Sequence, residues 1–217
     1  MKRRAIVAGA TGLFGQELVA LLLDDETYEE VTVLVRRPLG YADPKLRERI
    51  VDFGDLAAAN LSLAGADVFC ALGTTIKKAG SQEAFRQVDH DYPLSLGRLA
   101  KEQGAAQMLI VTSLGADPRS RAFYLRVKGE VEQALRGLDL ACLHVFRPSL
   151  LLGRREEFRL GERVMSAVLP IFAGIMGRYR PVRAQAVAAA MLAAALSGQA
   201  GVRIHDTKRI LLAAREK

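Results

Sequence analysis

The stretch that decides the fold is Arg4-Ala5-Ile6-Val7-Ala8-Gly9-Ala10-Thr11-Gly12-Leu13-Phe14-Gly15, at residues 4–15. Residues 4–8 predict a short apolar strand, the glycine-rich run 9–15 predicts a tight turn, and the apolar spacing of 18–23 predicts a helix. Strand, glycine-rich turn and helix in this order open a dinucleotide-binding unit. Glycines let the backbone approach a pyrophosphate closely, and the N-terminus of the helix offers free N–H groups.

The three glycines of the turn have the spacing Gly-x-x-Gly-x-x-Gly, in place of the more common Gly-x-Gly-x-x-Gly. The predicted cofactor-binding residues of this turn are Gly9, Thr11, Gly12, Leu13, Phe14 and Gly15. The alternative is a tight strand-to-helix turn that binds no ligand.

The second predicted strand, 31–35, ends in Arg36-Arg37-Pro38. An NAD-binding unit usually places a carboxylate about 20 residues beyond its glycines, where it holds the ribose 2′-hydroxyl. Here two arginines stand in its place, and guanidinium groups bind a 2′-phosphate well. The sequence therefore favours NADP over NAD, and the alternative for Arg36 and Arg37 is a solvated strand end.

The composition is that of a globular protein with one well-buried core. The chain has 217 residues, 50% of them hydrophobic and 25% charged, with a formal net charge of +7. Its arginines and lysines are spread along the chain without a basic block, so no nucleic-acid partner is predicted. The excess of positive charge suits a polyanionic cofactor. Cys70 and Cys142 fall in apolar strand-like runs and are predicted to be buried, reduced thiols.

No targeting or metal-binding pattern is found in the sequence. Lys2-Arg3-Arg4 leads into a short strand, without the pattern of a secretory signal, and no apolar run reaches the length of a transmembrane helix. We therefore expect a cytoplasmic protein. His90 and His144 have no cysteine or histidine partner at metal-ligand spacing, so both are interpreted as structural and no metal site is predicted.

Short apolar runs alternate with helical patterns through most of the chain. The predicted strands are Ala5–Ala8, Val31–Val35, Ile50–Asp52, Asp67–Ala71, Met108–Thr112, Ala141–Phe146 and Val202–His205. The predicted helices are Phe14–Asp24, Gln82–Gln103, Ala122–Arg136, a segment near Glu157–Leu169, and Arg183–Leu196. This α/β pattern predicts a single doubly wound parallel sheet, a Rossmann fold, because apolar strands without polar alternation are typical of sheets covered on both faces.

We expect residues 1–217 to form one domain, in which 149–182 make a small substrate-facing lobe near the C-terminus. The alternation of strands and helices breaks down within this lobe. Its apolar stretch Leu169–Met176 is too short to span a bilayer. Three roles are open for the stretch: core, a cap over a hydrophobic substrate, or a homodimer interface.

Tyr124 and Lys128 are four residues apart and share one face of a predicted helix. The lysine ammonium favours the phenolate, which makes the tyrosine a workable general acid–base, and it can also bind ribose hydroxyls. Ser113 ends the preceding strand and is placed to hydrogen-bond the reacting oxygen of a substrate. The alternative is a surface tyrosine beside a solvated lysine.

These segments together resemble an atypical short-chain dehydrogenase/reductase, most closely the Tat-interacting-protein-like group of that superfamily. The motifs that match are Gly-Ala-Thr-Gly-Leu-Phe-Gly at 9–15, Leu-Val-Arg-Arg-Pro at 34–38, Leu-Gly-Thr-Thr at 72–75, Ser-Leu-Gly-Ala-Asp at 113–117, Tyr-Leu-Arg-Val-Lys-Gly-Glu-Val-Glu at 124–132 and Phe-Arg-Pro-Ser-Leu-Leu-Leu-Gly at 146–153. The resemblance covers nearly the whole chain.

The resemblance implies a Rossmann fold that binds NADP, with Ser113, Tyr124 and Lys128 in the catalytic positions and Arg36 and Arg37 near the 2′-phosphate. It further implies that Asp55 faces the adenine, that Leu72, Gly73 and Thr74 form the wall over the cofactor ribose, and that Pro148 lies beside the nicotinamide. The segment after residue 150 is shorter than in the sugar-nucleotide epimerases of the superfamily, which argues against a nucleotide-sugar substrate.

The first hypothesis for function is an NADP-dependent oxidoreductase acting on a carbonyl or alcohol, with a small and apolar molecule as substrate. The second is an NADP-binding regulatory or assembly protein with little turnover. A third is a redox-neutral isomerase or dehydratase that keeps its cofactor tightly bound. Fold-level analogy does not identify the substrate.

Overall fold

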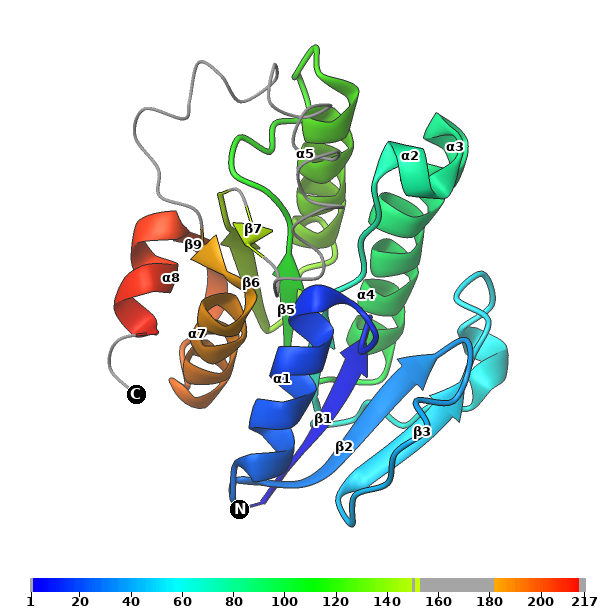
Figure 1. Cartoon of the computed structure of the whole chain (residues 1–217), viewed down its shortest axis with the longest axis vertical. Helices are drawn as coiled ribbons and strands as arrows, with labels where there is room; N and C mark the ends of the chain where they lie inside the picture. The colour runs from blue at the N-terminus through cyan, green and yellow to red at the C-terminus, as the bar shows by residue number, and fades with distance from the viewer. Residues whose placement is uncertain (1, 150, 153–181, 215–217) are drawn as a thin grey trace.

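The computed structural model describes residues 2–149, 151–152 and 182–214. At its centre β1 (Arg3–Ala8) lies between β2 (Tyr28–Val35) and β4 (Asp67–Cys70) and pairs with both in parallel (Figure 1). These strands are rich in valine and other apolar residues because helices cover both faces of the sheet.

In the described part of the chain, the main sheet has the order β3-β2-β1-β4-β5-β6-β9, and its pairings are parallel throughout. The remaining strands of this sheet are β3 (Leu46–Ile50), β5 (Gln107–Val111), β6 (Cys142–Arg147) and β9 (Gly201–Asp206). A separate pair joins β7 (Leu151–Leu152) to β8 (Val182–Arg183). The predicted doubly wound parallel sheet is confirmed. Its strand order reverses between β1 and β4, and folds of this kind bind ligands at the carboxyl ends of the strands at such a point.

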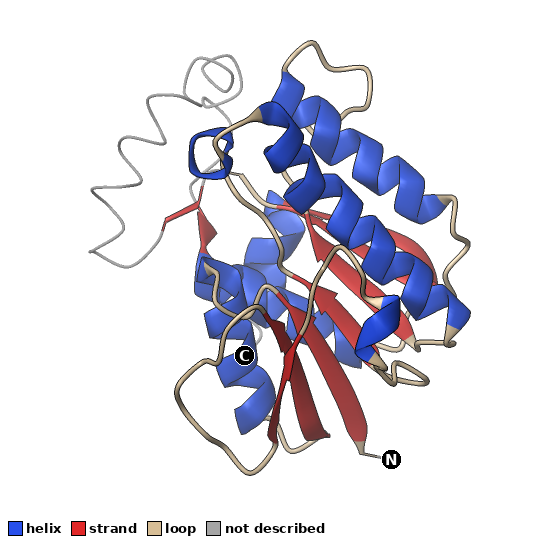
Figure 2. Ribbon diagram, turned by 90° about the vertical axis from the view of Figure 1, so that its right-hand side faces the viewer, coloured by secondary structure: helices blue, strands red, loops and turns tan. Residues whose placement is uncertain are grey.

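Helices lie on both faces of the sheet (Figure 2). On one face α1 (Leu13–Asp24) packs against α7 (Ala184–Leu196), which in turn packs against α8 (Thr207–Ala213). On the other face lie α4 (Tyr92–Glu102) and α5 (Phe123–Arg136). Alternate strand residues fill two separate cores: Val7 packs with the α1 and α7 layer, and its neighbour Ile6 with the α4 and α5 layer.

The segment predicted as one helix over 82–103 is divided in the structure. It consists of α3 (Gln82–Arg86), a π-helical turn (Gln87–Asp91) and α4, and a further short helix, α2 (Ile76–Ala79), precedes it. The π turn adds a residue to the helical repeat and directs Asp89 inward, where it is 1% exposed. A pattern of apolar spacing does not reveal such an insertion.

Two other predictions need correction. The third strand is predicted at Ile50–Asp52 but covers Leu46–Ile50, because an edge strand with alternating charged residues lacks the apolar run that marks the other strands. Helix α8 is absent from the sequence prediction. The predicted helix near Glu157–Leu169, the apolar stretch Leu169–Met176 and most of the expected lobe lie outside the described residues.

Candidate cofactor and catalytic site

The glycine turn packs the end of β1 against the end of β4. Gly9 has a φ of +90°, and a Cβ on it would lie 2.5 Å from the carbonyl oxygen of Ala71. A Cβ on Gly15 would lie 2.0 Å from the Gly9 oxygen. Both positions therefore require glycine for packing alone. Gly12 differs, because its φ is −80° and a Cβ there would meet the Gly9 oxygen at 3.3 Å as its nearest neighbour.

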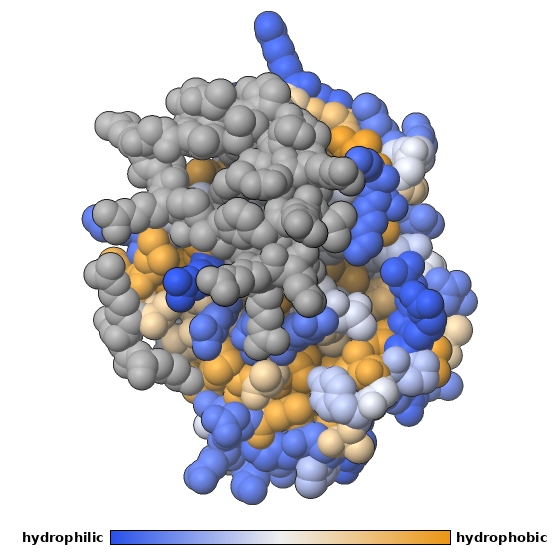
Figure 3. Space-filling model, in the orientation of Figure 1, coloured by the Kyte–Doolittle hydropathy of each residue, from blue (hydrophilic) through white to orange (hydrophobic). Residues whose placement is uncertain are grey.

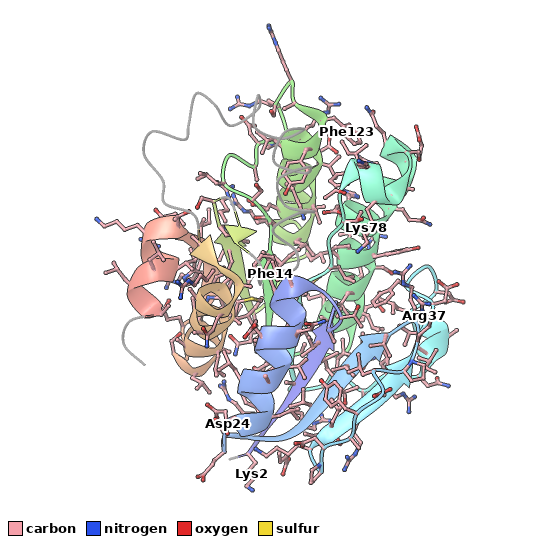
Figure 4. The ribbon with its side chains drawn as sticks, in the orientation of Figure 1. Lys2, Phe14, Asp24, Arg37, Lys78 and Phe123 are labelled. Carbon is pink, nitrogen blue, oxygen red and sulfur yellow. The ribbon has the colours of Figure 1, made fainter. Side chains whose placement is uncertain are left out.

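Helix α1 starts directly after Gly12 and has no side-chain cap on its first turn. The first N–H groups of a helix need external partners, and the positive end of the helix dipole favours an anion there. Thr11 and Gly12 are exposed, and Leu13 and Phe14 are half-buried. Figure 4 shows Phe14 at the carboxyl edge of the sheet, the edge at which Arg37 and Lys78 also lie.

Arg36 and Arg37 follow β2 and are both exposed. No ion pair to either guanidinium is present among the described residues. Hydrophilic residues form much of the right-hand surface in Figure 3, the side on which β2 and β3 lie. Asp55 is also exposed and accepts a hydrogen bond from the Ala58 N–H (3.2 Å), so its carboxylate caps the short turn Ala57–Ala59.

The segment after β4 connects to the π turn. Leu72 is half-buried, Gly73 is exposed, and the Thr74 N–H donates to Asp89 Oδ2 at 2.9 Å. A Cβ on Gly73 would lie 3.5 Å from Asp89 Oδ1 and 3.8 Å from Lys128 Nζ. The predicted ribose wall therefore lies directly beside the predicted catalytic lysine.

Lys128 and Asp89 form a buried ion pair, with 2.7 Å between Nζ and Oδ1 and side chains that are 6% and 1% exposed. Burial disfavours the ammonium. The carboxylate of Asp89 and the side chain of Tyr124 outweigh this effect and raise the pKa of Lys128 above its ordinary value. The lysine is therefore charged at neutral pH, although it is enclosed.

Tyr124 lies one turn before Lys128 on α5 and is half-buried. Its ring contacts the fully buried ring of Phe85, with 5.6 Å between the ring centroids. Phe85 belongs to α3, so this contact joins the start of α5 to the segment before the π turn. The sequence pattern places Tyr124 and Lys128 on one helical face, and the structure does so too.

The Ser113 loop, residues 113–117, is attached to both β6 and α5. Ser113 is 6% exposed, and the Leu114 N–H donates to the Pro148 oxygen at 2.9 Å. At the other end of the loop, the Asp117 N–H donates to the Leu125 oxygen of α5 at 3.2 Å. The structure thus connects the segments that carry Ser113, Pro148 and the tyrosine–lysine pair.

Sequence reasoning missed several residues that shape this site. Gly129 allows the Ser113 loop to pack closely against α5, because a Cβ there would lie 2.2 Å from the backbone of Asp117 and Pro118. Asp89, Phe85 and the buried Glu132 do not stand out in the sequence either. The only signal for Gly129 and Glu132 is their place in the motif at 124–132, and Asp89 has none.

The remaining candidate residues are histidines and cysteines, and their surroundings indicate structural roles. His90 Nδ1 lies 2.7 Å from Asp91 Oδ1, and His144 Nδ1 lies 2.9 Å from His205 Nε2. Cys70 and Cys142 are buried free thiols. Among residues 2–149, 151–152 and 182–214, no group of histidine, cysteine and acidic side chains has the geometry of a metal site.

Comparison with known proteins relates the chain to nucleotide-binding proteins. A family model described as NAD(P)H-binding matches residues 9–195. Protein HTATIP2 of Rattus norvegicus is 38% identical over 164 residues, which are 74% of this chain and 67% of that protein. Protein FMP52, mitochondrial, of Eremothecium gossypii is 32% identical over 214 residues, 95% of each chain.

The fold also matches solved structures. MoeE5 in complex with UDP-glucose and NAD has a TM-score of 0.71 and 16% sequence identity, and the match covers 98% of this chain and 81% of that one. An identity this low shows a shared fold and carries no inference about substrate.

The expectation of a cytoplasmic location is contradicted by the relatives. Fungal relatives from Eremothecium gossypii, Candida glabrata and Coccidioides immitis are each named Protein FMP52, mitochondrial. The expectation was wrong because it rested on a missing secretory pattern and a missing spanning segment, and neither distinguishes the cytoplasm from an organelle. Within the described ranges, no helix combines the length and hydropathy needed to cross a bilayer.

Proposed function

The chain belongs to the NAD(P)H-binding family, and from this premise we infer that it is an NADP-dependent oxidoreductase of the atypical short-chain dehydrogenase/reductase type. The reaction we propose moves a hydride between the nicotinamide and a carbonyl or secondary alcohol. The family relationship supports a dinucleotide cofactor, and the residues around Lys128 support the chemistry.

The observation that carries the proposal is the buried, charged Lys128 one helical turn from Tyr124. When bound, the reduced cofactor supplies the hydride. Tyr124 donates a proton to the carbonyl oxygen, and the Ser113 hydroxyl hydrogen-bonds the same oxygen. The Lys128 ammonium stabilises the phenolate that Tyr124 becomes, and Asp89 keeps that ammonium charged.

The residues of the glycine turn fit a dinucleotide. The uncapped N-terminus of α1 offers N–H groups to the pyrophosphate, and Gly12 is exposed and carries no side chain to block a close approach. We assign the 2′-phosphate to Arg36 and Arg37, whose exposed guanidinium groups suit a phosphate dianion. The other proposed cofactor contacts are Gly9, Thr11, Leu13, Phe14, Gly15, Asp55, Leu72, Gly73, Thr74, Lys128 and Pro148.

The experiment that tests the function combines binding with turnover. NADPH binding is measured by calorimetry, and NADPH oxidation is then followed by absorbance over a panel of carbonyl compounds, apolar ones first. For a compound that reacts, Tyr124→Phe is expected to lower kcat by about two to four orders of magnitude, the range for a lost general acid–base group. Tyr41→Phe is the matched control, because Tyr41 is 51% exposed in the loop before β3.

Three outcomes would reject parts of the proposal. A full rate in Tyr124→Phe would remove the assigned mechanism. Tight NADPH binding without turnover of any carbonyl would favour a cofactor-binding regulatory protein. Product formation without net NADPH loss would instead indicate a redox-neutral isomerase or dehydratase.

A further inference from the structure

A second buried carboxylate lies below the proposed site, between α5 and the ends of β5 and β6. The Glu132 side chain is 2% exposed. Its Oε1 accepts hydrogen bonds from the Thr112 hydroxyl at 2.7 Å and from Arg147 Nε at 2.9 Å. Its Oε2 is contacted by Arg147 Nη2 and, at 3.5 Å, by Arg136 Nη2. One carboxylate thus joins three elements of the fold.

Each partner of this carboxylate adjoins a residue of the proposed site. Thr112 directly precedes Ser113, and Arg147 directly precedes Pro148. Glu132 itself lies on the helix that carries the proposed tyrosine and lysine, one turn beyond the lysine. The strand ends are also joined to each other, because the Thr112 N–H donates to the Phe146 carbonyl oxygen at 2.8 Å.

The stability of the fold does not by itself explain a buried carboxylate at this place. Removing a carboxylate from water costs several kcal/mol, and apolar residues of similar volume usually give equal or greater stability than a buried ion pair. Apolar contacts, however, are non-directional, whereas the two oxygens of Glu132 fix the direction of the Thr112 hydroxyl and the Arg147 guanidinium. The charge therefore adds geometric definition that an apolar cluster would lack.

We propose that Glu132 is a positioning residue for the oxidoreductase reaction, so this proposal rests on the proposed function. We call Thr112, Glu132 and Arg147 the Glu132 brace. The brace contacts neither substrate nor cofactor. It holds the strand ends that carry Ser113 and Pro148 at a fixed place relative to α5, so that the serine and tyrosine hydroxyls converge on one substrate oxygen.

The test separates positioning from stability. Glu132→Gln removes the charge and leaves the Arg147 guanidinium without its carboxylate. A triple variant, Thr112→Val with Glu132→Leu and Arg147→Met, replaces the Glu132 brace with apolar groups and is expected to recover the Tm of the unmodified protein. Glu130→Gln is the matched control, because Glu130 lies on the same helix and pairs with Arg86 on α3, with 27% of its side chain exposed.

With NADPH and phenanthrenequinone as the probe dicarbonyl, we expect kcat to fall about ten- to a hundredfold in both Glu132→Gln and the triple variant. The KM for NADPH should stay within about twofold, because the glycine turn and the arginines are untouched. Glu130→Gln should keep the unmodified kcat. A triple variant that recovers both Tm and kcat would show that the Glu132 brace is purely structural and would overturn the proposal.

A second readout does not depend on turnover. Amide hydrogen exchange at residues 113–117 should be at least about tenfold faster in the triple variant, even with its Tm restored, and unchanged in Glu130→Gln. Unchanged protection in the triple variant overturns the proposal. If the unmodified chain reduces no carbonyl, the oxidoreductase assignment fails, and the exchange measurement alone decides whether Glu132 fixes the Ser113 loop.

Discussion

Lys128 and Asp89 face each other inside the protein, with 2.7 Å between the ammonium nitrogen and one carboxylate oxygen. The second oxygen of Asp89 accepts the Thr74 N–H at 2.9 Å. The aspartate therefore connects α5 to the segment after β4, which the family resemblance assigns to the cofactor ribose. An ammonium group that is this deeply buried is stabilised only while its carboxylate partner is present.

Removing one member of this pair should be costly. We expect Asp89→Asn to lower the free energy of unfolding at pH 7 by about 3–5 kcal/mol, since an uncompensated ammonium would remain buried. Asp89→Asn combined with Lys128→Met should recover most of that loss. Urea denaturation of the single and double variants measures both effects, and additive losses in the double variant would show that the two residues are not coupled.

The glycine turn offers a comparison between neighbouring positions. A Cβ on Gly12 would make one tight contact, 3.3 Å from the Gly9 oxygen, and φ there is −80°, so we expect Gly12→Ala and Gly12→Val to fold after a small local adjustment. Both should lose NADPH binding, by about a hundredfold or more, because the added side chain occupies the space for the pyrophosphate. Gly9→Ala should instead destabilise the fold by about 1–3 kcal/mol, since its φ of +90° and the Ala71 backbone oppose a side chain.

Thermal unfolding and calorimetry with NADPH separate these two kinds of glycine. Retained NADPH affinity in a folded Gly12→Val variant would show that the turn only connects strand to helix. An unfolded Gly12→Val variant would mean that the space beside Gly12 is too small for a side chain and that this glycine, like Gly9, is required for packing.

The parts of the site that could be predicted from the sequence depend on short-range pattern. The glycine turn, Arg36 and Arg37, and the pair Tyr124 and Lys128 each lie within a few residues, so spacing alone places them on a turn, a strand end or a helical face. The parallel sheet follows from apolar runs in the same way. Residues that are far apart in the sequence and come together only in the folded chain could not be predicted from spacing.

Asp89 shows why the rest could not be predicted. It lies far from Lys128 in the sequence, within the π turn Gln87–Asp91. It faces inward because this turn interrupts a segment whose spacing otherwise fits one helix. Glu132 likewise acquires its partners from two strand ends that only the sheet brings together. The prediction misplaces the edge strand Leu46–Ile50 for a related reason, since its exposed side has charged residues in place of an apolar run.

Cofactor preference should depend on the arginines after β2. NADPH is expected to bind more tightly than NADH, and Arg36→Ala with Arg37→Ala should remove most of that preference. The expected loss is about 1.5–3 kcal/mol, or roughly ten- to a hundredfold, for charge-assisted hydrogen bonds to the 2′-phosphate. Affinities of the unmodified protein and the double variant for NADPH and NADH are measured by calorimetry at one salt concentration.

The control is Arg47→Ala with Arg49→Ala, which removes the same charge from the neighbouring edge strand β3. These arginines lie on the strand beside β2 and are both exposed. An equal loss in the control would mean that net charge, and not a 2′-phosphate contact, sets the affinity. Equal affinities for the two cofactors in the unmodified protein would reject the NADP assignment outright.

A pair of histidines lies between the neighbouring strands β6 and β9. His144 Nδ1 lies 2.9 Å from His205 Nε2, and the His205 ring stacks on Phe146 with 4.4 Å between the centroids. Burial, together with His144 and the nearby Arg209 and Arg203, lowers the pKa of His205 to about 4, and Asp206 only partly opposes this shift. Burial and Arg203 also lower the pKa of His144. Both rings are therefore neutral in the folded protein at pH 7.

The sign of the pH dependence follows from this difference. The ordinary pKa of a histidine side chain is 6.5, so the unfolded chain takes up a proton near that pH, whereas folded His205 does so only near pH 4. The unfolded state binds more protons in between, and stability should therefore fall as the pH is lowered from about 6.5 to about 4. With His205 partly exposed, we expect a loss of about 1–2 kcal/mol. Urea denaturation across this range should show a smaller loss in His205→Gln than in the unmodified protein. An unchanged pH dependence in His205→Gln would show that other groups control acid stability.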